Sequence, residues 1–360
     1  TTGIAQDGTG GTDMLIGIER VIGSAFGDVI IGSAAFSEFY VGGAGNDTID
    51  GGLSYDRAEY TAATAGITVN KNAIGPSSGT VIGDVSVGTD TLIGVEQVVG
   101  TAFADTYIAT GYVSPSAPGG LNQTYNEFEG ADGNDSITGN GNTRISFRTA
   151  LEGVSVDLGA GVAVGGASVG TDTFTGVSSV RGSAFADTLT GSAGLAANGF
   201  FESFEGRGGD DVISGGGGFD LARYAYDGAA TTGLVVNMAA GTVIGDPLVT
   251  GTDTLSSIES IQGSFLDDVY NAVGFSASSA NAGSNGTFNE FEGMAGNDQI
   301  TGNGNTRVSY ISAREGVNVN IATGIAIGGA SVGTDSFSGV IEIRGSNFDD
   351  TLIGSNNGTA

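Results

Sequence analysis

The sequence of 360 residues predicts an all-β fold, a parallel β-solenoid built from repeats of about 80 residues. Three observations support this prediction. The tripeptide Gly-Thr-Asp recurs along the whole chain, 67 Gly residues interrupt every candidate helix, and apolar residues alternate in short runs that are separated by Gly, Asn or Asp. Short strands with turn residues between them are typical of stacked β-coils.

The Gly-Thr-Asp tripeptides divide the chain into repeats. They begin at Gly11, Gly88, Gly170, Gly251 and Gly333. The second and fourth repeats share NEFEG and GNGNTR, whereas the first and third carry GGLSYDRAEY and GGGGFDLARY. We therefore predict a duplicated pair in one continuous solenoid. Its parts are a lead-in at 1–10, repeats at 11–87, 88–169, 170–250 and 251–332, and a partial repeat at 333–360.

Composition and charge exclude several classes of function. The chain has no Cys and no His, so it has no disulfide, no thiolate or His-ligated metal site, and no Ser-His or Cys-His nucleophile. Its net charge is −29, which disfavours binding to nucleic acid or to an anionic membrane surface. No apolar run is long enough to span a bilayer. A cation is the expected partner.

A Gly-rich motif that contains Asp recurs once in each full repeat. GGAGNDTID at 42–50 is the most complete copy, and GADGNDSIT, GRGGDDVIS and GMAGNDQIT lose only its second Gly. Calcium prefers six to eight oxygen ligands, which a Gly-rich turn provides through its carbonyls and an Asp through its carboxylate. We predict calcium ligation by Gly42, Gly43, Gly45, Asp47, Gly130, Gly133, Asp135, Gly206, Gly209, Asp211, Gly293, Gly296 and Asp298, with Ile49, Ile137, Ile213 and Ile300 in the core.

Three further sets of acidic residues are candidates. Degenerate segments of the form GSxFxD predict weaker ligands at Asp28, Asp105, Asp187, Asp268 and Asp350. A following nonapeptide places Asp56 and Asp220 at the metal position. The Gly-Thr-Asp carboxylates are either calcium ligands or turn caps, and they are Asp13, Asp90, Asp172, Asp253 and Asp335.

Two arginines are predicted at the position in the stacked coils that Asp56 and Asp220 occupy, which we call their column. In the second and fourth repeats we expect this column to hold Arg144 and Arg307. A guanidinium cannot ligate calcium, but it can take the cation's place beside neighbouring carboxylates. The alternative is a solvated arginine on a turn.

These motifs resemble the hemolysin-type calcium-binding nonapeptide repeats of RTX proteins, GGxGxDxUx, in which U is a large apolar residue. The resemblance covers nearly the whole chain, because segments such as GTDTLIGVE also look typical of RTX arrays. It implies an RTX-type β-roll or β-helix that binds several Ca²⁺ ions. It also implies secretion by a bacterial type I system and folding outside the cell or at the cell surface.

Two polar insertions and several aromatic residues are further features. The insertions at 109–126 and 272–289 should protrude as loops, and their Tyr112, Tyr125, Phe275 and Phe288 are either an adhesive platform or anchors that pin the loops. Two other series recur in register and are predicted to stack in the core. They are Phe39, Phe128, Phe204 and Phe291, and Phe26, Phe103, Phe185 and Phe348.

The sequence thus predicts an extracellular calcium-binding structural repeat protein that forms a rigid rod, filament, surface layer or adhesin stalk. We expect no enzymatic activity, because every Asp recurs from repeat to repeat and none belongs to a uniquely placed pair. Alternatives are the repeat domain of a larger secreted enzyme or toxin, and a polysaccharide lyase or hydrolase. Expected partners are calcium, copies of the chain head to tail, and surface polysaccharide. The chain begins and ends at the same point of the repeat, which suggests that it is a piece of a longer array.

Overall fold

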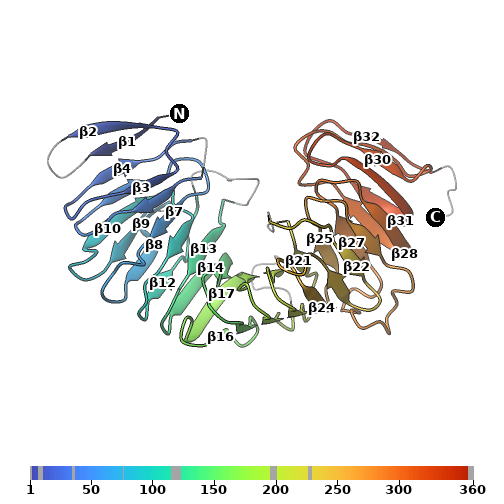
Figure 1. Ribbon diagram of the computed structural model, residues 1–360, viewed down its shortest axis with the longest axis horizontal. Coiled ribbons are helices and arrows are strands. Elements are labelled where there is room, and N and C mark those ends of the chain that lie inside the picture. The colour runs from blue at the N-terminus through green and yellow to red at the C-terminus, as the bar shows by residue number, and fades with distance from the viewer. Residues whose placement is uncertain are drawn as a thin grey trace. The chain divides into compact units, whose positions relative to one another are not determined.

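The computed structural model describes residues 2–6, 11–34, 37–75, 77–114, 123–194, 201–225 and 229–355. These residues form β-strands joined by turns, and they contain no helix that could cross a membrane (Figure 1). Most strand pairs are parallel, which confirms the predicted all-β solenoid class. The chain separates into two compact units, Thr1–Arg181 and Gly182–Ala360.

The strands of the first unit form two ladders with the core between them. The long ladder contains, in spatial order, β4 (Val29–Ile31), β6 (Thr48–Asp50), β10 (Thr89–Ile93), β9 (Ser78–Ile82), β8 (Thr68–Gly75), β12 (Thr106–Ile108), the first part of β14 (Ser136–Ser146), the first part of β17 (Thr171–Arg181), β16 (Val162–Val164) and β15 (Ser155–Asp157). The hairpin of β1 (Thr2–Gln6) and β2 (Thr12–Ile16) covers β4. The short ladder contains β3 (Arg20–Ile22), β5 (Phe39–Val41), β7 (Arg57–Glu59), β11 (Gln97–Val99), β13 (Asn126–Glu129) and the last parts of β14 and β17.

The long ladder contains antiparallel segments that the sequence analysis did not predict. β8, β9 and β10 form an antiparallel meander, as do β15, β16 and β17. The turn between β9 and β10 closes through the Gly83 N–H, which donates to the Gly88 carbonyl at 2.9 Å. Short turns join neighbouring strands in opposite directions, so the chain doubles back before it continues the solenoid.

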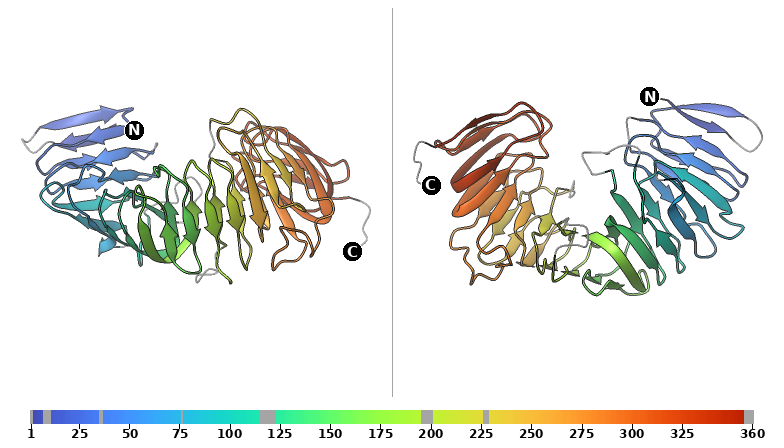
Figure 2. Two further views of the ribbon diagram at one scale, coloured as in Figure 1. Left: turned by 60° about the horizontal axis from the view of Figure 1, so that its bottom comes forward. Right: turned by 180° about the vertical axis from the view of Figure 1, so that it is seen from behind.

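The meanders make the two ladders unequal. Each adds strands to the long ladder and none to the short one. Because neighbouring strands lie about 4.8 Å apart, the long ladder must extend further than the short one over the same coils. The strands of this unit accordingly spread like a fan (Figures 1 and 2). The outward side chains of the short ladder are therefore crowded, and Gln97, Glu127 and Glu129 are buried.

The second unit repeats this arrangement. Its long ladder contains β18 (Thr188–Thr190), β20 (Val212–Ser214), β24 (Thr252–Ser256), β23 (Thr242–Ile244), β22 (Val235–Asn237), β26 (Val269–Asn271), the first part of β28 (Gln299–Ser309), the first part of β31 (Thr334–Arg344), β30 (Ile325–Ile327), β29 (Asn318–Asn320) and β32 (Thr351–Ile353). Its short ladder contains β19 (Ser203–Glu205), β21 (Leu221–Arg223), β25 (Ser260–Gln262), β27 (Asn289–Glu292) and the last parts of β28 and β31.

The core lies between the two ladders of each unit. Seven of the predicted core residues are buried, namely Ile49, Ile137, Ile213, Ile300, Phe128, Phe204 and Phe291. Tyr107 stacks on Phe128 with ring centroids 4.7 Å apart, and Tyr270 stacks on Phe291 at 4.6 Å. Phe39 does not belong to this series, because its side chain points outward and Tyr40 fills the core instead.

The second predicted phenylalanine series is exposed, which corrects the sequence interpretation. Phe26 is 64% exposed, and Phe103, Phe185 and Phe348 are exposed as well. Each occupies a turn at the edge of the solenoid and not a strand, so the alternation of strand side chains does not direct it inward. In that turn the Phe26 N–H donates to Ser24 Oγ at 3.2 Å.

The loop aromatics act as anchors. Tyr112, Tyr125 and Phe275 are buried, which supports the anchor alternative and not an adhesive platform made of these rings. Residues 115–122 of the first insertion lie outside the described residues. In the second insertion Asn281 is buried and donates to the Ile258 carbonyl at 2.7 Å, which holds the loop against the turn between β24 and β25.

Candidate metal centre

The motif carboxylates stack along one edge of each unit. The Asp28 N–H donates to Asp47 Oδ1 at 2.8 Å, and the Asp47 N–H donates to Asp90 Oδ1 at 2.9 Å. We call such a series a carboxylate ladder. Three more ladders have the same bonds, at N···O distances from 2.8 to 3.0 Å. They are Asp105–Asp135–Asp172, Asp187–Asp211–Asp253 and Asp268–Asp298–Asp335.

The second carboxylate oxygen of each nonapeptide Asp is buried and has no hydrogen-bond partner. These atoms are the Oδ2 atoms of Asp47, Asp135, Asp211 and Asp298. Each lies against the first Gly of its own motif, so that a Cβ on Gly42 would approach Asp47 Oδ2 to 2.2 Å. An ionised oxygen buried without a donor is unfavourable, and a bound cation would remove that penalty. The donor set therefore fits calcium.

The other ligands of such an ion must come from the backbone. Among the residues that the structure describes, no group of three or more acidic side chains converges. Each turn instead offers one carboxylate and the carbonyls of a Gly-rich segment, which are oxygens of the kind that calcium prefers. This explains why the motif is rich in Gly around a single Asp.

The backbone conformation of the turn persists where the second Gly is lost. Gly43 has φ of 98°, and the residues at the same position are Ala131, Arg207 and Met294 with φ of 65°, 74° and 68°. A left-handed conformation costs a non-Gly residue about 1 kcal/mol. The degenerate copies therefore keep the turn geometry at the expense of local strain.

The carboxylates of the GSxFxD segments are satisfied by the protein. Asp28 Oδ2 accepts the Ser24 N–H at 2.6 Å, and the Ser24 hydroxyl also donates to this carboxylate. The residue at the second position is Ser or Thr in each copy, and its N–H donates to the Asp four residues later. The other recipients are Asp105, Asp187, Asp268 and Asp350. These carboxylates close their own turn and lack the unpartnered oxygen of the nonapeptides.

A second ladder of carboxylates lies on the other edge. The Glu38 N–H donates to Asp56 Oδ1 at 2.8 Å, and the Asp56 N–H donates to Glu96 Oε2 at 2.9 Å. In the second unit, the Asp220 N–H donates to Glu259 Oε2 at 3.0 Å. Asp56 Oδ2 and Asp220 Oδ2 are buried without a partner, as in the nonapeptides of the first edge.

The prediction that Arg144 and Arg307 occupy the column of Asp56 and Asp220 is wrong by one residue. The strand register pairs Arg144 with Glu127 and Thr143 with Asn126, so Thr143 continues the column of Asp56, and Thr306 does so in the second unit. The reason is that the GNGNTR turn is one residue shorter than the GGLSYDR turn. Thr143 Oγ1 donates to Asn126 Oδ1 at 3.0 Å. This turn therefore has no carboxylate for calcium.

The arginines pair with carboxylates of the neighbouring strand. Arg144 is buried, and its Nε donates to Glu127 Oε2 at 2.9 Å. Arg307 pairs with Glu290, and its Nη1 lies 3.2 Å from Glu342 Oε1. A solvated Arg144 was therefore a wrong alternative.

Four of the five Gly-Thr-Asp carboxylates are the third members of the ladders. Asp90, Asp172, Asp253 and Asp335 are buried and accept the N–H of a nonapeptide Asp, so they do not cap their own turn. Tyr224 Oη donates to Asp253 Oδ2 at 2.8 Å, and Tyr310 Oη donates to Asp335 Oδ2 at 3.1 Å. Asp13 is exposed.

Burial makes the ladder carboxylates hold protons tightly. It raises the pKa of Asp135 to about 8, and together with the neighbouring Asp253 and Asp335 it raises the pKa of Asp211 and Asp298 to about 9. Burial likewise raises the pKa of Asp56 and Asp220 to about 8. At neutral pH these groups need a positive charge to remain ionised inside the turns.

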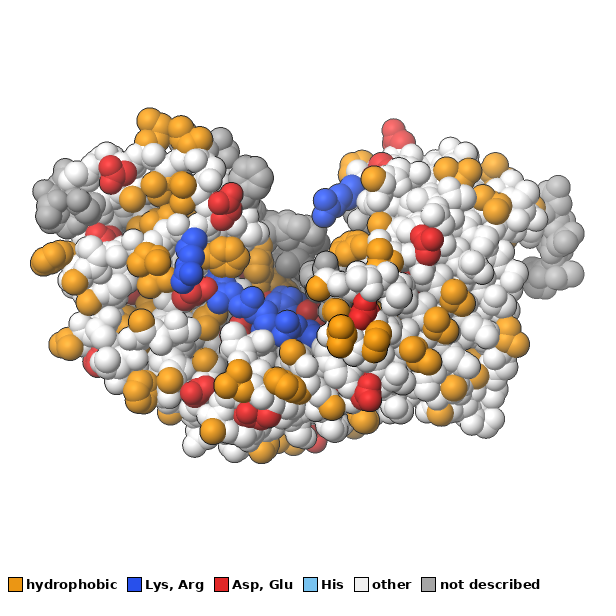
Figure 3. Space-filling view, in the orientation of Figure 1, with side chains coloured by type: hydrophobic (Ala, Val, Ile, Leu, Met, Phe, Trp, Pro, Cys, Tyr) orange, Lys and Arg blue, Asp and Glu red, His pale blue; other side chains and the backbone are white. Residues whose placement is uncertain are grey.

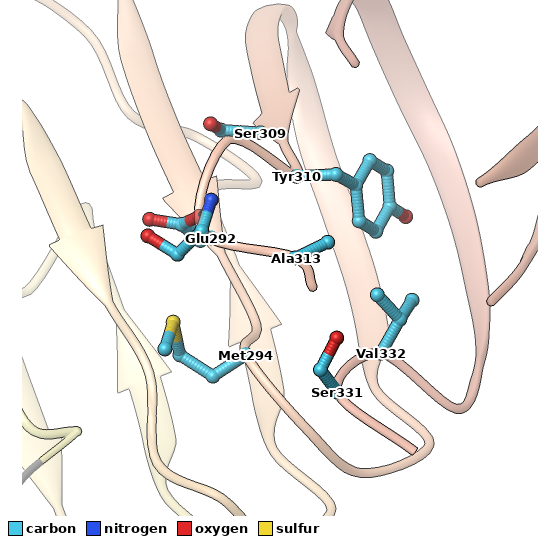
Figure 4. A pocket seen from close by; sticks show the side chains of 8 residues that line it. Glu292, Met294, Ser309, Tyr310, Ala313, Ser331 and Val332 are labelled. Carbon is cyan, nitrogen blue, oxygen red and sulfur yellow. Dashed lines mark hydrogen bonds between the residues drawn. The ribbon is translucent and has the colours of Figure 1, made fainter. Parts of the chain in front are cut away.

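A small cavity lies beside the nonapeptide turn of the fourth predicted repeat. It is lined by Glu292, Met294, Ser309, Tyr310 and neighbouring side chains, and its volume is about 10 Å³ (Figure 4). Such a volume holds at most one water molecule. Glu292 Oε1 accepts the Ser312 N–H at 2.8 Å at its wall. This cavity is too small for a sugar ring.

The family comparison identifies the turns. The model of the RTX calcium-binding nonapeptide repeat (4 copies) matches residues 35–57, 200–222 and 284–306. The chain carries RTX calcium-binding repeats. The matched segments contain Asp47, Asp56, Asp211, Asp220 and Asp298, five of the carboxylates with a buried unpartnered oxygen. The match confirms the predicted resemblance and calcium as the ion. No curated protein matches the chain.

Asp47→Asn should weaken calcium binding more than Asp28→Asn. Asp47→Asn keeps the oxygen that accepts the Asp28 N–H, and Asp28→Asn keeps that N–H, but only Asp47 has a buried carboxylate oxygen without a donor. We expect the calcium midpoint of folding to rise about tenfold for Asp47→Asn, as loss of one charged ligand implies. A calcium titration followed by circular dichroism measures both midpoints. Equal midpoints for the two variants would contradict this ranking.

Proposed function

We propose that this RTX-type chain is an extracellular structural protein in which calcium binds the stacked turns together into a rigid rod, filament, surface layer or adhesin stalk. The observation that carries the proposal is the set of buried, unpartnered carboxylate oxygens at both edges of the coils. They recur in both units, as a scaffold requires. A single catalytic site would not need this repetition.

Six carboxylates are the proposed ligands. They are Asp47, Asp56, Asp135, Asp211, Asp220 and Asp298, each with carbonyl oxygens of its own Gly-rich turn. Calcium supplies positive charge that keeps these buried groups ionised. Their other oxygens accept N–H groups of the preceding coil, so occupancy of one turn also favours the fold of the next. The GSxFxD carboxylates would contribute little.

RTX repeats are typical of secreted proteins, and this supports the extracellular or bacterial cell surface location and the type I route that we propose. Head-to-tail contact between copies is part of the same proposal. The repeat domain of a larger secreted enzyme or toxin is the second candidate, and the calcium-binding repeats themselves favour it equally. We propose no catalytic role for the described turns, because their acidic residues belong to repeated ladders.

The number of bound ions tests the proposal. Isothermal calorimetry together with native mass spectrometry should give about six calcium ions per chain, one for each buried unpartnered nonapeptide oxygen. Asp56→Asn should remove one ion, because Asp56 Oδ2 is among these atoms, whereas Asp28→Asn should remove none. A chain that binds at most one ion would contradict a calcium-stabilised scaffold.

A further inference from the structure

The only lysine of the sequence lies in the core of the first unit. Lys71 belongs to β8, where it shares the inner face with Val69, and it is 2% exposed. Figure 3 shows basic side chains together on the surface near β7, β13 and β14, whereas Lys71 is hidden in the interior. A buried ammonium group is unfavourable unless nearby oxygens and negative charges replace its lost hydration. Its surroundings therefore indicate its role.

Lys71 is held against the coil that contains Glu96. Its Nζ donates to the Val95 carbonyl and lies 4.4 Å from the centroid of the Tyr112 ring. The Tyr112 hydroxyl donates to the same carbonyl at 3.1 Å. Burial lowers the pKa of Lys71 to about 8, and the charge of Glu96 opposes that decrease. The ammonium group is therefore still largely protonated at neutral pH, and Glu96 is the carboxylate that balances it.

Glu96 connects this lysine to a proposed calcium ligand. Its Oε2 accepts the Asp56 N–H at 2.9 Å, and its own N–H donates to the Asp56 carbonyl at 3.1 Å. The Gly51 N–H donates to the Ile93 carbonyl at 2.8 Å, so residues 93–96 stack directly on the turn that contains Asp56. Burial raises the pKa of Asp56 to about 8, and the charge of Glu96 contributes to that increase. The two carboxylates repel each other, and Lys71 offsets part of that negative charge.

The second unit has the same ladder without the lysine. The segments GITVNK and GVEQ of the first unit align with GLVVNM and SIES of the second, so Met238 takes the place of Lys71 and is buried as well. Asn281 Nδ2 donates to the Ile258 carbonyl at 2.7 Å, at the position where the first unit uses its ammonium group. A neutral amide thus satisfies the carbonyl in the second unit. The hydrogen bond that the lysine makes could therefore be made without a charge.

This difference in charge bears on calcium. A cation bound at the Asp56 turn is attracted by the charge of Glu96 and repelled by the charge of Lys71. Inside a protein, two charges roughly 10 Å apart still interact strongly enough to change a binding constant about tenfold. Asp50 adds a negative charge near Asp56, but its side chain is partly exposed, so solvent screens it more than the buried lysine. The lysine should therefore have the larger effect.

We propose that Lys71 sets the calcium affinity of the Asp56 turn: its buried ammonium group offsets the charge of Glu96 and thereby lowers the affinity of that turn for calcium. This inference rests on the proposed calcium ligation by Asp56 and adds a tuning residue that lies outside the nonapeptide motif. Lys71 acts through its charge and is not itself a ligand. The matching turn of the second unit, at Asp220, has no such lysine and is not weakened in this way.

The test measures calcium binding by the whole chain with calorimetry and native mass spectrometry at buffered free calcium. The ion that Asp56→Asn loses identifies the Asp56 turn. Lys71→Met gives the first unit the residue of the second, and it should bind this ion about tenfold more tightly. Lys71→Met combined with Asp56→Asn should bind calcium like Asp56→Asn alone. Met238→Leu, a neutral exchange at the matched position, should leave the calcium affinities unchanged.

The direction of the change separates charge from packing, because a loosened core would weaken calcium binding and not strengthen it. Unchanged or weaker binding at the Asp56 turn in Lys71→Met would overturn the proposal while leaving calcium ligation by Asp56 intact. An Asp56→Asn chain that loses no ion would overturn both.

Circular dichroism in calcium shows whether Lys71→Met folds. If it does not, Lys71→Gln decides by the same criteria, because its amide can donate to the Val95 carbonyl as Asn281 does to Ile258, without a charge.

Discussion

Removal of calcium at neutral pH should convert the chain from a β-rich structure to an expanded coil. The net charge of −29 favours expansion, and the buried carboxylates with raised pKa values lose their only favourable charge partner. Because each ladder joins neighbouring coils through Asp N–H bonds, the loss should spread along each unit. Millimolar calcium should restore the fold. Magnesium should do so poorly, since it requires tighter octahedral geometry.

Circular dichroism and small-angle scattering measure this transition. The calcium-free chain should lose its β signal and reach a radius of gyration of roughly 70 Å, the value for an unfolded chain of this length. A salt titration without calcium is the control, because screening alone should recover only part of the compaction. A chelated protein that keeps both its β signal and its compact radius would refute calcium-dependent folding.

Acidification should replace part of the effect of calcium. The pKa of Asp211 and Asp298 is about 9 in the fold and 3.8 ordinarily, and that of Asp56, Asp135 and Asp220 is about 8. These groups bind protons more tightly in the calcium-free fold than in the unfolded chain. The stability that they contribute is therefore complete below about pH 4 and is lost as the pH rises towards 8 or 9.

Calcium-free protein moved from about pH 8 to about pH 5 should thus regain β structure. Each carboxyl group that titrates adds up to about 1.4 kcal/mol per pH unit to the free energy of unfolding. Asp298→Asn mimics the protonated group and should stabilise the calcium-free fold at pH 8. Asp84→Asn is the matched control without that gain, because hydrogen bonds from Ser86 and Thr64 lower the pKa of Asp84. A β signal that does not recover on acidification would contradict the prediction.

Much of the fold and of the candidate centre was predictable because it depends on local sequence. Gly is needed where φ is positive, as at Gly43 and Gly45, and the apolar residue two positions after each Asp enters a strand whose inner face is the core. The motif alone therefore predicted the burial of Ile49 and Ile213. Asp47 and Asp211 were predicted as ligands on the same grounds, and their buried oxygens fit that role.

Stacking between coils decided what the sequence could not. A turn shortened by one residue moved Thr143, and not Arg144, into the column of Asp56, and only the strand register shows that shift. Asp28 and Asp47 occupy the same motif position, yet Asp28 Oδ2 accepts the Ser24 N–H whereas Asp47 Oδ2 has no donor. Phe26 is exposed because its turn lies outside the strands. The sequence by itself determined where the turns and core strands lie, since glycine conformation and alternation act within a few residues. Which oxygen lacks a donor and which side chains meet depend on neighbouring coils, and only the tertiary structure places those.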